Sequence, residues 1–561
     1  MDKSDGAAST AVWGIDLGTT YSCISKVDDF GHPIVVNNRD GDPVTPSAVM
    51  FLGPTDIQVG KEAKRQMQLD PDRVCELVKR HMGDAEWRFA IDGKEWKAPE
   101  VSAQILKALC EDAELQTGEK VEKVLITVPA YFGIAEREAT IAAGKMAGLE
   151  VVDVINEPTA AAMSYGFAQG ADVDETVLVY DLGGGTFDVT AIKLEPRDSG
   201  SHIRVVATGG DHRLGGAQWD QEIVKLIVDK FLAAHPGAPD PLDDQVATAE
   251  LRLAAEDLKR ALTLRGSVNQ IVVSGDVRDS VEITREEFEQ ATRNLLDQTI
   301  EFTRETVEEA KRLGVDKVDR VLLVGGSSFM PAVAERLAET FEGWVPELAD
   351  PNQAVAKGAA LLGFQAELRA RLDDAAAASG GDSASPDVEQ RVAEEMGVAV
   401  DTVQRIRDTA VTNVCSKAFG VKLLRDGSDP GSEDPSDYRI DHVILAQTPL
   451  PAEPDTRTYG TIVDNQTSVI IELWEQAGSN LSEEVAHNKY LGEGVISLPG
   501  NDPAGSPLSV TLKMVEGGIL SARASHYSGS QLEFEVEVEG GVATQEEIEA
   551  GAARVAAMKR A

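Results

Sequence analysis

Two aspartates and three glycines between residues 177 and 188 have the types and spacing of a phosphate-binding turn. The run VLVYDLGGGTFD ends an apolar segment at Asp181, continues through Gly183–Gly185, and adds Thr186 and Asp188. This pattern predicts a strand, a tight turn and a second strand. Glycine has no Cβ, so backbone N–H groups can approach an anion closely. Carboxylates beside a phosphate require a cation between them, and oxygen ligands favour Mg²⁺.

A near-copy of this pattern lies upstream, in the run VWGIDLGTTYSCI that begins at Val12. Asp16 again ends an apolar segment, and Gly18 opens a turn that continues through Thr20. A lone glycine-rich turn is usually only a turn. Two matched copies predict a duplicated fold that clamps one nucleotide between its halves.

Further stretches could contribute to the same site. Glu157 stands at a predicted strand-to-helix corner, where Pro158 favours the first turn of a helix. Lys79 is near the end of the predicted helix Asp72–His81, a place where a cation is most often a solvated cap. Two more glycine turns follow, at Gly215 and Gly216 and at Gly325, Gly326 and Ser327.

The predicted helix Ala247–Leu264 carries a polar stripe whose members recur at i, i+3, i+4 and i+7 and therefore share one face. They are Glu256, Lys259, Arg260 and Thr263. Such a stripe is usually a solvated face, so it supports a binding site only together with the glycine turns. After Asp350 and Asn352, a further helix is expected to close this region near Gln365.

Composition narrows the class of protein. The 561 residues are enough for about two to four domains. The 95 acidic and 53 basic residues give a net charge of −42, which argues against non-specific binding to nucleic acid or an anionic membrane. The four cysteines form no CxxC pair, so we expect a reducing, cytoplasmic location. No apolar run is long enough to span a bilayer. Residues 1–10 are polar, and we expect a disordered tail without a secretory signal.

Over Val12–Gln365 the chain resembles the nucleotide-binding domain of the seventy-kilodalton heat-shock proteins, the DnaK-type chaperones. The motifs that carry the resemblance are GIDLGTTYSC, VPAYF, INEPTAAAMSYG, DLGGGTFDVT and a VGGSS turn followed by Pro331. This family has an actin-like α/β fold with two lobes around an ATP cleft. The resemblance therefore implies such a domain at residues 11–366, with ATP or ADP, Mg²⁺ and K⁺ as its ligands.

The same resemblance implies a role for each matching residue. The catalytic residues would be Lys79, Asp16, Glu157, Asp181 and Thr186. Lys79 would hold the γ-phosphate and position the attacking water, with Thr186 beside it. Mg²⁺ would be held mostly through water by Asp16, Glu157 and Asp181, and potassium by Asp188 with Asp16 and Tyr21. The ATP-binding residues would be Gly18, Thr19, Thr20, Tyr21, Lys79, Gly183, Gly184, Gly185, Thr186, Gly215, Gly216, Glu256, Lys259, Arg260, Thr263, Gly325, Gly326, Ser327, Phe329 and Asn352.

Two further positions follow from the resemblance, and one departs from it. Pro129 and Arg137 match a relay that links the family's cleft to its partner domain. Phe329 occupies the position of an arginine that commonly covers one face of adenine. An aromatic ring can also stack on a base, although it lacks the cation–π character of arginine.

The chain differs more from the family after Gln365. Residues 367–411 replace the usual apolar linker with an acidic stretch that predicts two short helices, Val388–Met396 and Thr402–Asp408. The apolar spacing around Gly397 faintly resembles a helix-turn-helix, but base-reading residues are few and the chain is acidic. A helical spacer is therefore favoured over a DNA-binding motif.

Residues 412–541 show alternating runs broken by Gly, Pro, Asp and Asn, which predict a β-sandwich. The expected strands include Arg457–Val463, Ser468–Glu475 and Leu532–Val538. The region resembles the family's β substrate-binding domain through DNQ at Asp464, NKYLG at Asn488 and GGILSA at Gly517. Matching peptide-pocket positions are Val421, Leu423, Ile462, Val469 and Ile471. An ordinary sandwich core explains these five equally well. Residues 542–561 predict one helix, a truncated lid.

Together these features predict an ATP-dependent molecular chaperone that hydrolyses ATP and binds exposed apolar peptides of unfolded proteins. Expected partners include a J-domain co-chaperone and a nucleotide-exchange factor. The main alternative is a nucleotide-sensing interaction module of the same family, with slow hydrolysis and no refolding activity. A sugar kinase or an actin-like filament protein is disfavoured by the C-terminal β region.

Overall fold

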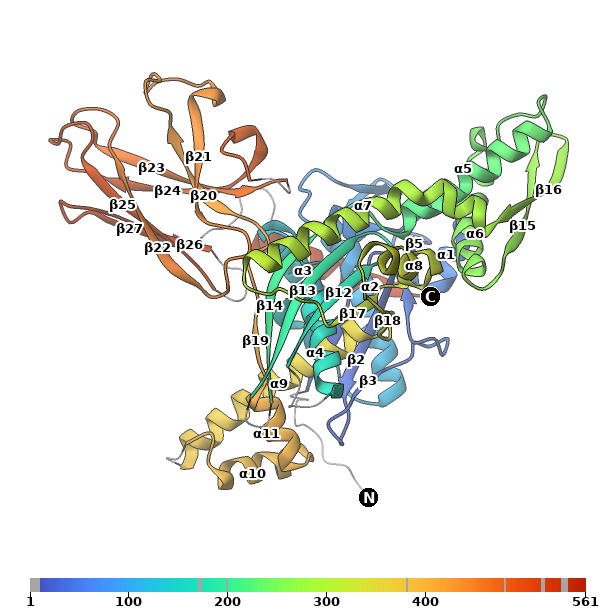
Figure 1. The fold of residues 1–561 in the computed structure, drawn as a ribbon, viewed down its shortest axis with the longest axis horizontal. Helices are drawn as coiled ribbons and strands as arrows, with labels where there is room; N and C mark the ends of the chain where they lie inside the picture. Colours follow the sequence, from blue (N-terminus) through green and yellow to red (C-terminus); the bar gives the residue numbers. More distant parts are fainter. Residues whose placement is uncertain are drawn as a thin grey trace. The chain divides into compact units, whose positions relative to one another are not determined.

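The computed structural model describes residues 11–169, 174–197, 200–379, 382–478, 481–515, 520–535 and 543–561 (Figure 1). The chain divides into two compact units. Unit 1 comprises Met1–Ala130, Ala139–Val411 and Ala543–Ala561, and unit 2 comprises Tyr131–Glu138 and Thr412–Val542. The tail at residues 1–10 and the start of the GGILSA motif, Gly517–Ile519, lie outside the described residues.

Unit 1 contains two sheets with the same strand order and the same strand directions. The first runs β11-β10-β1-β2-β3 and the second β18-β17-β12-β13-β14. In each, the central strand is antiparallel to the next strand in sequence and parallel to the strand on its other side. The first sheet consists of β1 (Val12–Asp16), β2 (Tyr21–Val27), β3 (Pro33–Val35), β10 (Lys123–Val128) and β11 (Glu150–Asn156), with β4 (Thr45–Pro46) on β2. The second consists of β12 (Glu175–Leu182), β13 (Phe187–Pro196), β14 (Ser201–Asp211), β17 (Arg320–Val324) and β18 (Pro346–Leu348), and it gains β19 (Ala410–Thr412) at its edge.

Close helix packing brings the two sheets together. Helices α4 (Glu157–Gln169) and α9 (Ala354–Ser379) cross where a Cβ on Gly358 would lie 1.7 Å from the Ala160 carbonyl oxygen. The first sheet meets α9 where a Cβ on Gly14 would lie 2.1 Å from the Ala360 nitrogen. Such distances leave no room for a side chain, so glycine is required at both contacts.

One face of the second sheet carries a large apolar core. Its most buried large side chains are Tyr180, Phe187, Trp219 and Phe231. They pack beneath α5 (Gly216–Ala234), α6 (Gln245–Leu264), α7 (Arg285–Arg312), α8 (Pro331–Thr340), β15 (Ser267–Ser274) and β16 (Val277–Thr284). The start of α7 is fixed by a capping box, in which Thr284 accepts from the Glu287 amide and Glu287 accepts from that of Thr284.

The helix predicted at Asp72–His81 is wrong. In its place are a 3₁₀ turn (Pro71–Arg73), a short strand β7 (Val74–Cys75) that pairs with β5 (Val49–Phe51), and a second 3₁₀ turn (Val78–His81). The pairing with β5 takes two residues out of any helix, and Leu77 has a left-handed φ of 56°. Lys79 therefore lies on a tight turn and is buried instead of ending a solvated helix.

Helix α9 continues to Ser379, well past the expected end near Gln365. Leu368, Leu372 and Ala375 extend its apolar stripe and pack against α10 (Pro386–Met396) and α11 (Val400–Asp408). The two short helices have the expected bounds within a few residues, and both belong to unit 1 (Figure 1). The helix-turn-helix spacing is explained by this packing, because Ala393, Val403 and Ile406 are all buried in the shared core.

Unit 2 contains two four-stranded antiparallel sheets, ordered β21-β20-β23-β24 and β22-β25-β26-β27. Inward side chains from both sheets form one apolar core. The strands are β20 (Phe419–Leu424), β21 (Tyr438–Ile444), β22 (Ala452–Gly460), β23 (Ser468–Gln476), β24 (Asn488–Ser497), β25 (Pro507–Met514), β26 (Leu520–His526) and β27 (Gln531–Glu535). Strand β22 begins earlier than the predicted Arg457, because a register shift between Ala452 and Asp455 accommodates Pro454 at a sheet edge.

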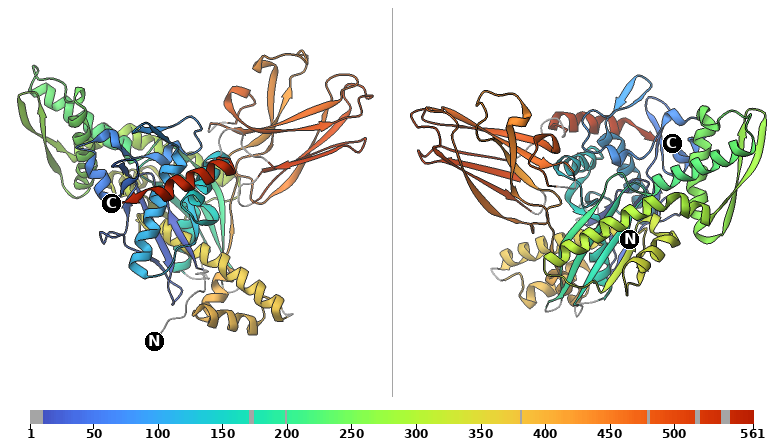
Figure 2. Two further views of the ribbon diagram at one scale, coloured as in Figure 1. Left: turned by 180° about the vertical axis from the view of Figure 1, so that it is seen from behind. Right: turned by 45° about the horizontal axis from the view of Figure 1, so that its top comes forward.

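The C-terminal helix, α12 (Gln545–Ala557), and a two-residue strand, β28 (Lys559–Arg560), belong to unit 1. Figure 2 shows α12, in red, beside α2 (Ala98–Thr117), in blue. Strand β28 extends the small sheet β28-β6-β5-β7, in which β6 is Asp56–Val59. The helix predicted as a truncated lid therefore packs on unit 1, because its apolar face, centred on Val555, fits Ala103, Ala142 and Met146. The remaining described α-helices and strands are α1 (Lys61–Gln66), α3 (Ile134–Met146), β8 (Phe89–Ile91) and β9 (Lys94–Trp96).

Candidate functional site

The two predicted glycine turns open onto one cavity of about 530 Å³ in unit 1. The cavity lies at the ends of the two central strands, β1 and β12, so both Asp-Leu-Gly turns face it. The predicted residues that line it are Asp16, Gly18, Thr19, Thr20, Tyr21, Lys79, Glu157, Asp181, Gly183, Gly184, Thr186, Glu256, Lys259, Arg260, Thr263, Gly325, Gly326, Ser327, Phe329 and Asn352. Gly185, Gly215, Gly216 and Asp188 are not among the lining residues and support those that are.

The two turns are in direct contact. A Cβ on Gly184 would lie 2.0 Å from the Thr20 hydroxyl oxygen, and one on Gly185 would lie 2.3 Å from Thr19 Cγ2. Within the first turn, a Cβ on Gly18 would lie 1.9 Å from the Tyr21 carbonyl oxygen. The glycines therefore allow two backbone segments to face the same space at close range, as an anion site requires.

A second layer of backbone holds the turn at Gly183 in place. The Gly183 amide donates to Thr186 O at 3.0 Å, and the Gly183 carbonyl accepts from the Gly216 amide at 2.9 Å. The same carbonyl accepts from the Ser327 hydroxyl at 2.9 Å. Gly215 lies tightly against Gly185, since its Cβ would be 2.5 Å from the Gly185 carbonyl carbon. The glycine turns at 215 and 325 thus position the phosphate turn from behind.

Buried charges gather at the centre of the cavity. Lys79 and Glu157 form an ion pair, and the two residues are only 5% and 7% exposed. Burial and the neighbouring Glu157 charge raise the pKa of Asp16 to about 7. Burial, Glu157 and Asp16 also raise the pKa of Asp181 well above its usual range. Several carboxylates thus share one nearby cation, so the site favours additional positive charge.

The chemistry of this donor set fits Mg²⁺ held through water. Among the described residues, no group of three or more His, Cys, Asp or Glu side chains is arranged to bind a metal ion directly. Asp16, Glu157 and Asp181 nevertheless line the same cavity as the phosphate turns. Carboxylates that share a cavity with phosphate turns suit a hydrated Mg²⁺, which keeps several of its waters when it binds protein and phosphate.

Asp188 lies behind the cleft, directly across the strand pair from Asp181. Its Oδ1 accepts from the Ala130 amide at 3.1 Å, while its buried Oδ2 has no hydrogen-bond partner among the described residues. Burial, followed by the charges of Glu157 and Asp181, raises the pKa of Asp188 well above its usual range. Pro129 adjoins this contact, whereas Arg137 belongs to the segment grouped with unit 2. The potassium site and the relay stay predictions.

The far end of the cavity is held by a charged cluster between α1 and α6. Glu256 pairs with Lys64, accepts from the Tyr21 hydroxyl at 2.7 Å and lies 3.0 Å from Arg260 Nη2. Burial alone would raise the pKa of Glu256, but Lys64 and the other cations outweigh burial and lower the pKa to about 2. Lys259 donates to Gly216 O at 3.0 Å and pairs with Asp220 at 2.8 Å.

Phe329 is at the mouth of this end and is 42% exposed. Several other residues also line the cavity and were not predicted from the sequence, among them Val44, Asp220 and Leu264. Leu264 lies eight residues after Glu256, on the same helix face as the predicted stripe, so its position could have been inferred. Arg80 is another missed residue: its Nη2 donates to Gly185 O at 2.9 Å. The sequence indicated Arg80 only through its position next to Lys79.

The predicted peptide-pocket residues of unit 2 mostly face the sandwich core. Val421 and Ile471 are buried, and Leu423 and Val469 pack against the same core. Ile462 is half-exposed in the segment after β22. The outward face carries a different apolar pair, Ile470 and Val495, which lie directly opposite each other on β23 and β24 and are 54% and 52% exposed.

The duplicated sheets, the paired glycine turns and the buried charges define a nucleotide-binding protein. A family model described as Hsp70 protein matches residues 12–368, which is more than half of the chain. The chain belongs to the Hsp70 family. Members of this family have an actin-like ATPase fold, bind ATP or ADP with Mg²⁺, hydrolyse ATP, and act as chaperones on unfolded peptides together with co-chaperones. No helix within the described residues is long and apolar enough to cross a membrane.

Proposed function

We propose that this protein is an ATP-dependent molecular chaperone, which hydrolyses ATP to ADP and phosphate and binds exposed apolar segments of unfolded proteins. The observation that carries the proposal is the pair of glycine turns in contact with each other, which line the same cavity as the Lys79–Glu157 ion pair. Backbone amides, the ammonium groups of Lys79 and Lys259 and several carboxylates in a cavity of about 530 Å³ suit a nucleoside triphosphate with its cation.

The reaction is an in-line attack by water on the γ-phosphorus. A bond forms from the water oxygen to phosphorus, the bond to the β,γ-bridging oxygen breaks, and ADP leaves with the electron pair. The water proton passes to the phosphate product or to solvent. Most of the catalysis comes from positioning and electrostatics, as in phosphoryl transfer generally.

Several groups of the cleft would bind or orient the reacting phosphate. The Lys79 ammonium holds the γ-phosphate and orients the attacking water, and Glu157 fixes that ammonium through their ion pair. The Thr186 side chain lies at the second turn beside the same phosphate. Backbone amides of the turns at Gly18 and Gly183 receive the remaining phosphate oxygens.

Asp16, Glu157 and Asp181 would hold Mg²⁺ through its waters. Bound Mg²⁺ supplies neutralisation of the phosphate charge. Without that charge, the burial that raises the pKa of Asp16 and Asp181 opposes their ionised forms. K⁺ near Asp188 is a further part of the proposal.

The peptide-binding half of the proposal rests on unit 2. A two-sheet β-sandwich can hold an extended peptide through strand-like hydrogen bonds and an apolar pocket. Ile462, Ile470 and Val495 are apolar side chains of this unit that are about half-exposed, so a peptide can reach them. A J-domain co-chaperone, a nucleotide-exchange factor and a cytoplasmic location complete the proposal.

The alternative is a nucleotide-sensing interaction module with slow hydrolysis and no refolding activity. One observation favours it: both the spacer helices α10 and α11 and the C-terminal helix α12 are packed into unit 1. A ligand can shift an equilibrium only by its differential affinity for two states. If these segments stay packed in both nucleotide states, peptide binding gains little from ATP.

Measurement of phosphate release by the full chain with Mg²⁺ and ATP distinguishes the chaperone from the nucleotide-sensing module. The reaction is run alone, with an unfolded apolar peptide, and with a matched peptide whose apolar residues are replaced by serine. Turnover that only the apolar peptide accelerates supports the chaperone. Turnover that neither peptide changes supports the nucleotide-sensing module. No Mg²⁺-dependent phosphate release above the buffer rate contradicts the ATPase itself.

A further inference from the structure

The segment 543–561, named here the C-terminal segment, is docked on unit 1 through both backbone and side chains. Strand β28 pairs in parallel with β6, so that Lys559 N donates to Thr55 O at 2.7 Å and Ala561 N donates to Ile57 O at 2.9 Å. Val555 and Met558 are buried. The Lys107 ammonium donates to the Val555 and Met558 carbonyls at 3.3 and 3.2 Å, which satisfies carbonyls at the end of α12.

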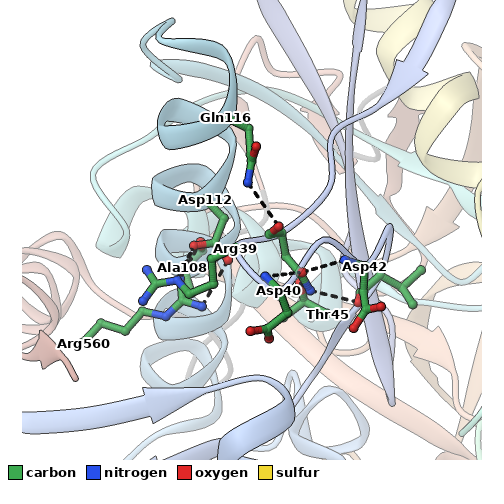
Figure 3. A network of polar contacts seen from close by, with 10 residues as sticks. Arg39, Asp40, Asp42, Thr45, Ala108, Asp112, Gln116 and Arg560 are labelled. Atoms are coloured by element: carbon green, nitrogen blue, oxygen red, sulfur yellow. Dashed lines mark hydrogen bonds and ion pairs between the residues drawn. The ribbon is translucent and has the colours of Figure 1, made fainter.

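Arg560 is the polar anchor of this segment (Figure 3). Its Nη1 and Nη2 donate to the two carboxylate oxygens of Asp112 at 2.7 and 3.1 Å, and Nη1 also reaches Ala108 O at 3.0 Å. The Arg560 and Asp112 side chains are almost completely buried. A two-point ion pair of this kind has a fixed geometry, and loss of one partner would leave a buried charge unpaired.

Asp112 connects the segment to the loop 38–45. Its Oδ1 also accepts from Arg39 Nε at 2.8 Å. Gln116, one turn further along α2, donates to Asn38 O at 3.4 Å. Figure 3 shows both contacts on the face of α2 that carries Asp112. Helix α2 therefore holds the first two residues of the loop while Arg560 holds Asp112 in place.

The side chain of Asn38 organises the loop from within. Its Oδ1 accepts from the Asp40 and Asp42 amides at 3.0 Å each. Its Nδ2 donates to Val44 O at 3.2 Å and to Thr45 Oγ1 at 3.1 Å. Because Val44 lines the nucleotide cavity, a change in the shape of this loop alters a wall of the site.

The end of the loop is bonded to the first phosphate turn. Thr45 pairs with Ser22 in the contact between β4 and β2. The Ser47 amide donates to Thr20 O at 2.8 Å, and the Ser47 hydroxyl donates to Gly18 O at 2.8 Å. Gly18 N in turn donates to Ser22 Oγ at 3.1 Å. A path of hydrogen bonds and adjacent residues thus joins Arg560 to the turn at Gly18–Tyr21.

We propose that Arg560 is a positioning residue for the first phosphate turn, acting through Asp112, Arg39 and the loop 38–45. The C-terminal segment then sets nucleotide affinity from a distance, although none of its residues reaches the cavity. This inference rests on the proposed function, since it takes the cavity to hold ATP. By linkage, nucleotide binding strengthens the docking of the segment as much as docking strengthens nucleotide binding.

Three variants of the full chain test the path. Arg560→Ala removes the two-point pair, and we expect ATP affinity to fall by about 3- to 10-fold, the scale of coupling along a bonded network. Arg560→Lys keeps the positive charge with one point of contact, so its loss is expected to be smaller. Lys559→Ala is the matched control: it removes one positive charge from the neighbouring, exposed residue of the same strand and should bind ATP as the unmodified chain does.

Three measurements are made on each variant. Titration with a fluorescent ATP analogue gives the affinity, and thermal unfolding shows whether the fold is intact. Hydrogen exchange in the nucleotide-free protein reports the path itself. Arg560→Ala should speed exchange at the Ser47 and Gly18 amides relative to Lys559→Ala, and a merely structural contact at the surface of α2 would leave these two amides unchanged.

The outcomes separate this inference from the proposed function. Equal ATP affinity and equal exchange at Ser47 and Gly18 in Arg560→Ala and Lys559→Ala overturn the positioning role. If the unmodified chain binds no nucleotide, the proposed function fails, while hydrogen exchange still decides whether the path exists. If Arg560→Ala lowers the melting temperature sharply, the comparison of Arg560→Lys with Lys559→Ala decides, and equal affinity there also overturns the role.

Discussion

The two units differ in what they place at the positions where function is expected. In unit 1 the cavity contains buried charges, with Lys79, Glu157 and Asp181 all nearly inaccessible to solvent. In unit 2 the candidate positions are apolar, and Val421 and Ile471 are indistinguishable from the residues that hold the sandwich together. Burying a charge costs free energy of folding unless the charge is paired, whereas buried apolar side chains are found in every core.

This difference explains why functional residues can be recognised from the sequence more readily in unit 1 than in unit 2. A charge in a closed site needs a partner of fixed type, so few residues satisfy each position and the motif stays recognisable. An apolar pocket accepts many side chains of similar volume. The comparison can be tested by breaking each unit separately, beginning with the change expected to have the largest effect.

Lys79→Ala should lower the rate of ATP hydrolysis by about 10²- to 10³-fold, the usual loss when one charge-stabilising group is removed from a reacting centre. ADP binding should stay within about threefold of the unmodified chain, because the glycine turns remain. Single-turnover phosphate release gives the rate, and Lys145→Ala, at an exposed position on α3, is the control. Hydrolysis at the unmodified rate would remove Lys79 from the mechanism.

Ile471→Ala should lower the free energy of unfolding of unit 2 by about 2–4 kcal/mol, because it leaves a cavity in the sandwich core. The matched change, Ile470→Ala, lies on the outward face of the same strand and should cost less than about 0.5 kcal/mol. Urea unfolding followed by hydrogen exchange at the strand amides of unit 2 gives both values. If both variants lose a similar free energy of unfolding, the assignment of Ile471 to the core and Ile470 to the outward face is wrong.

Asp181→Asn should raise the Mg²⁺ concentration needed for half-maximal turnover by about 10- to 100-fold, the range for residues that hold a metal through water. Thr186→Ala should reduce turnover with an unchanged Mg²⁺ requirement, because its hydroxyl lies at the phosphate and not at the metal in our proposal. Mg²⁺ titrations of phosphate release measure both. An unchanged titration for Asp181→Asn would mean that the cation is held elsewhere.

Phe329→Ala should weaken ATP and ADP binding by about 1 kcal/mol each, the scale of one aromatic stacking contact. Phe329 is at the mouth of the cavity and half-exposed, so the adenine ring can cover it. Calorimetric titration with both nucleotides tests this, with Phe329→Tyr as the variant that keeps an aromatic ring. Unaltered affinity in Phe329→Ala would exclude stacking at this position.

Much of unit 1 follows from the sequence because local patterns and long-range packing agree there. The repeated Asp-Leu-Gly turns imply two equivalent sheets, and the structure contains them in the same strand order. The segment Asp72–His81 could not be derived in this way. Its residues suit a helix locally, but β5 pairs with Val74 and Cys75, and that tertiary contact prevails.

The C-terminal segment and the spacer show the same limit. The apolar positions of α12 are evident in the sequence, but nothing in them says which surface they cover. Likewise, no local signal ends α9 at Gln365, and the helix continues because Leu368 and Leu372 find partners on α10 and α11. In unit 2, alternation reveals strands but does not tell an inward isoleucine from one that contacts a ligand.

The docking of β28 on β6 has a consequence for the order in which the protein is made. Unit 1 is built from segments on both sides of residues 412–542, so the sheet β28-β6-β5-β7 lacks its edge strand until Lys559 and Arg560 have been synthesised. Domains generally fold as units during synthesis, beginning at the N-terminus. The sequence of unit 2 is therefore synthesised before the strand β28 that unit 1 needs at this edge. A chain truncated after residue 542 should contain a folded sandwich and a nucleotide-binding unit whose β6 edge is open.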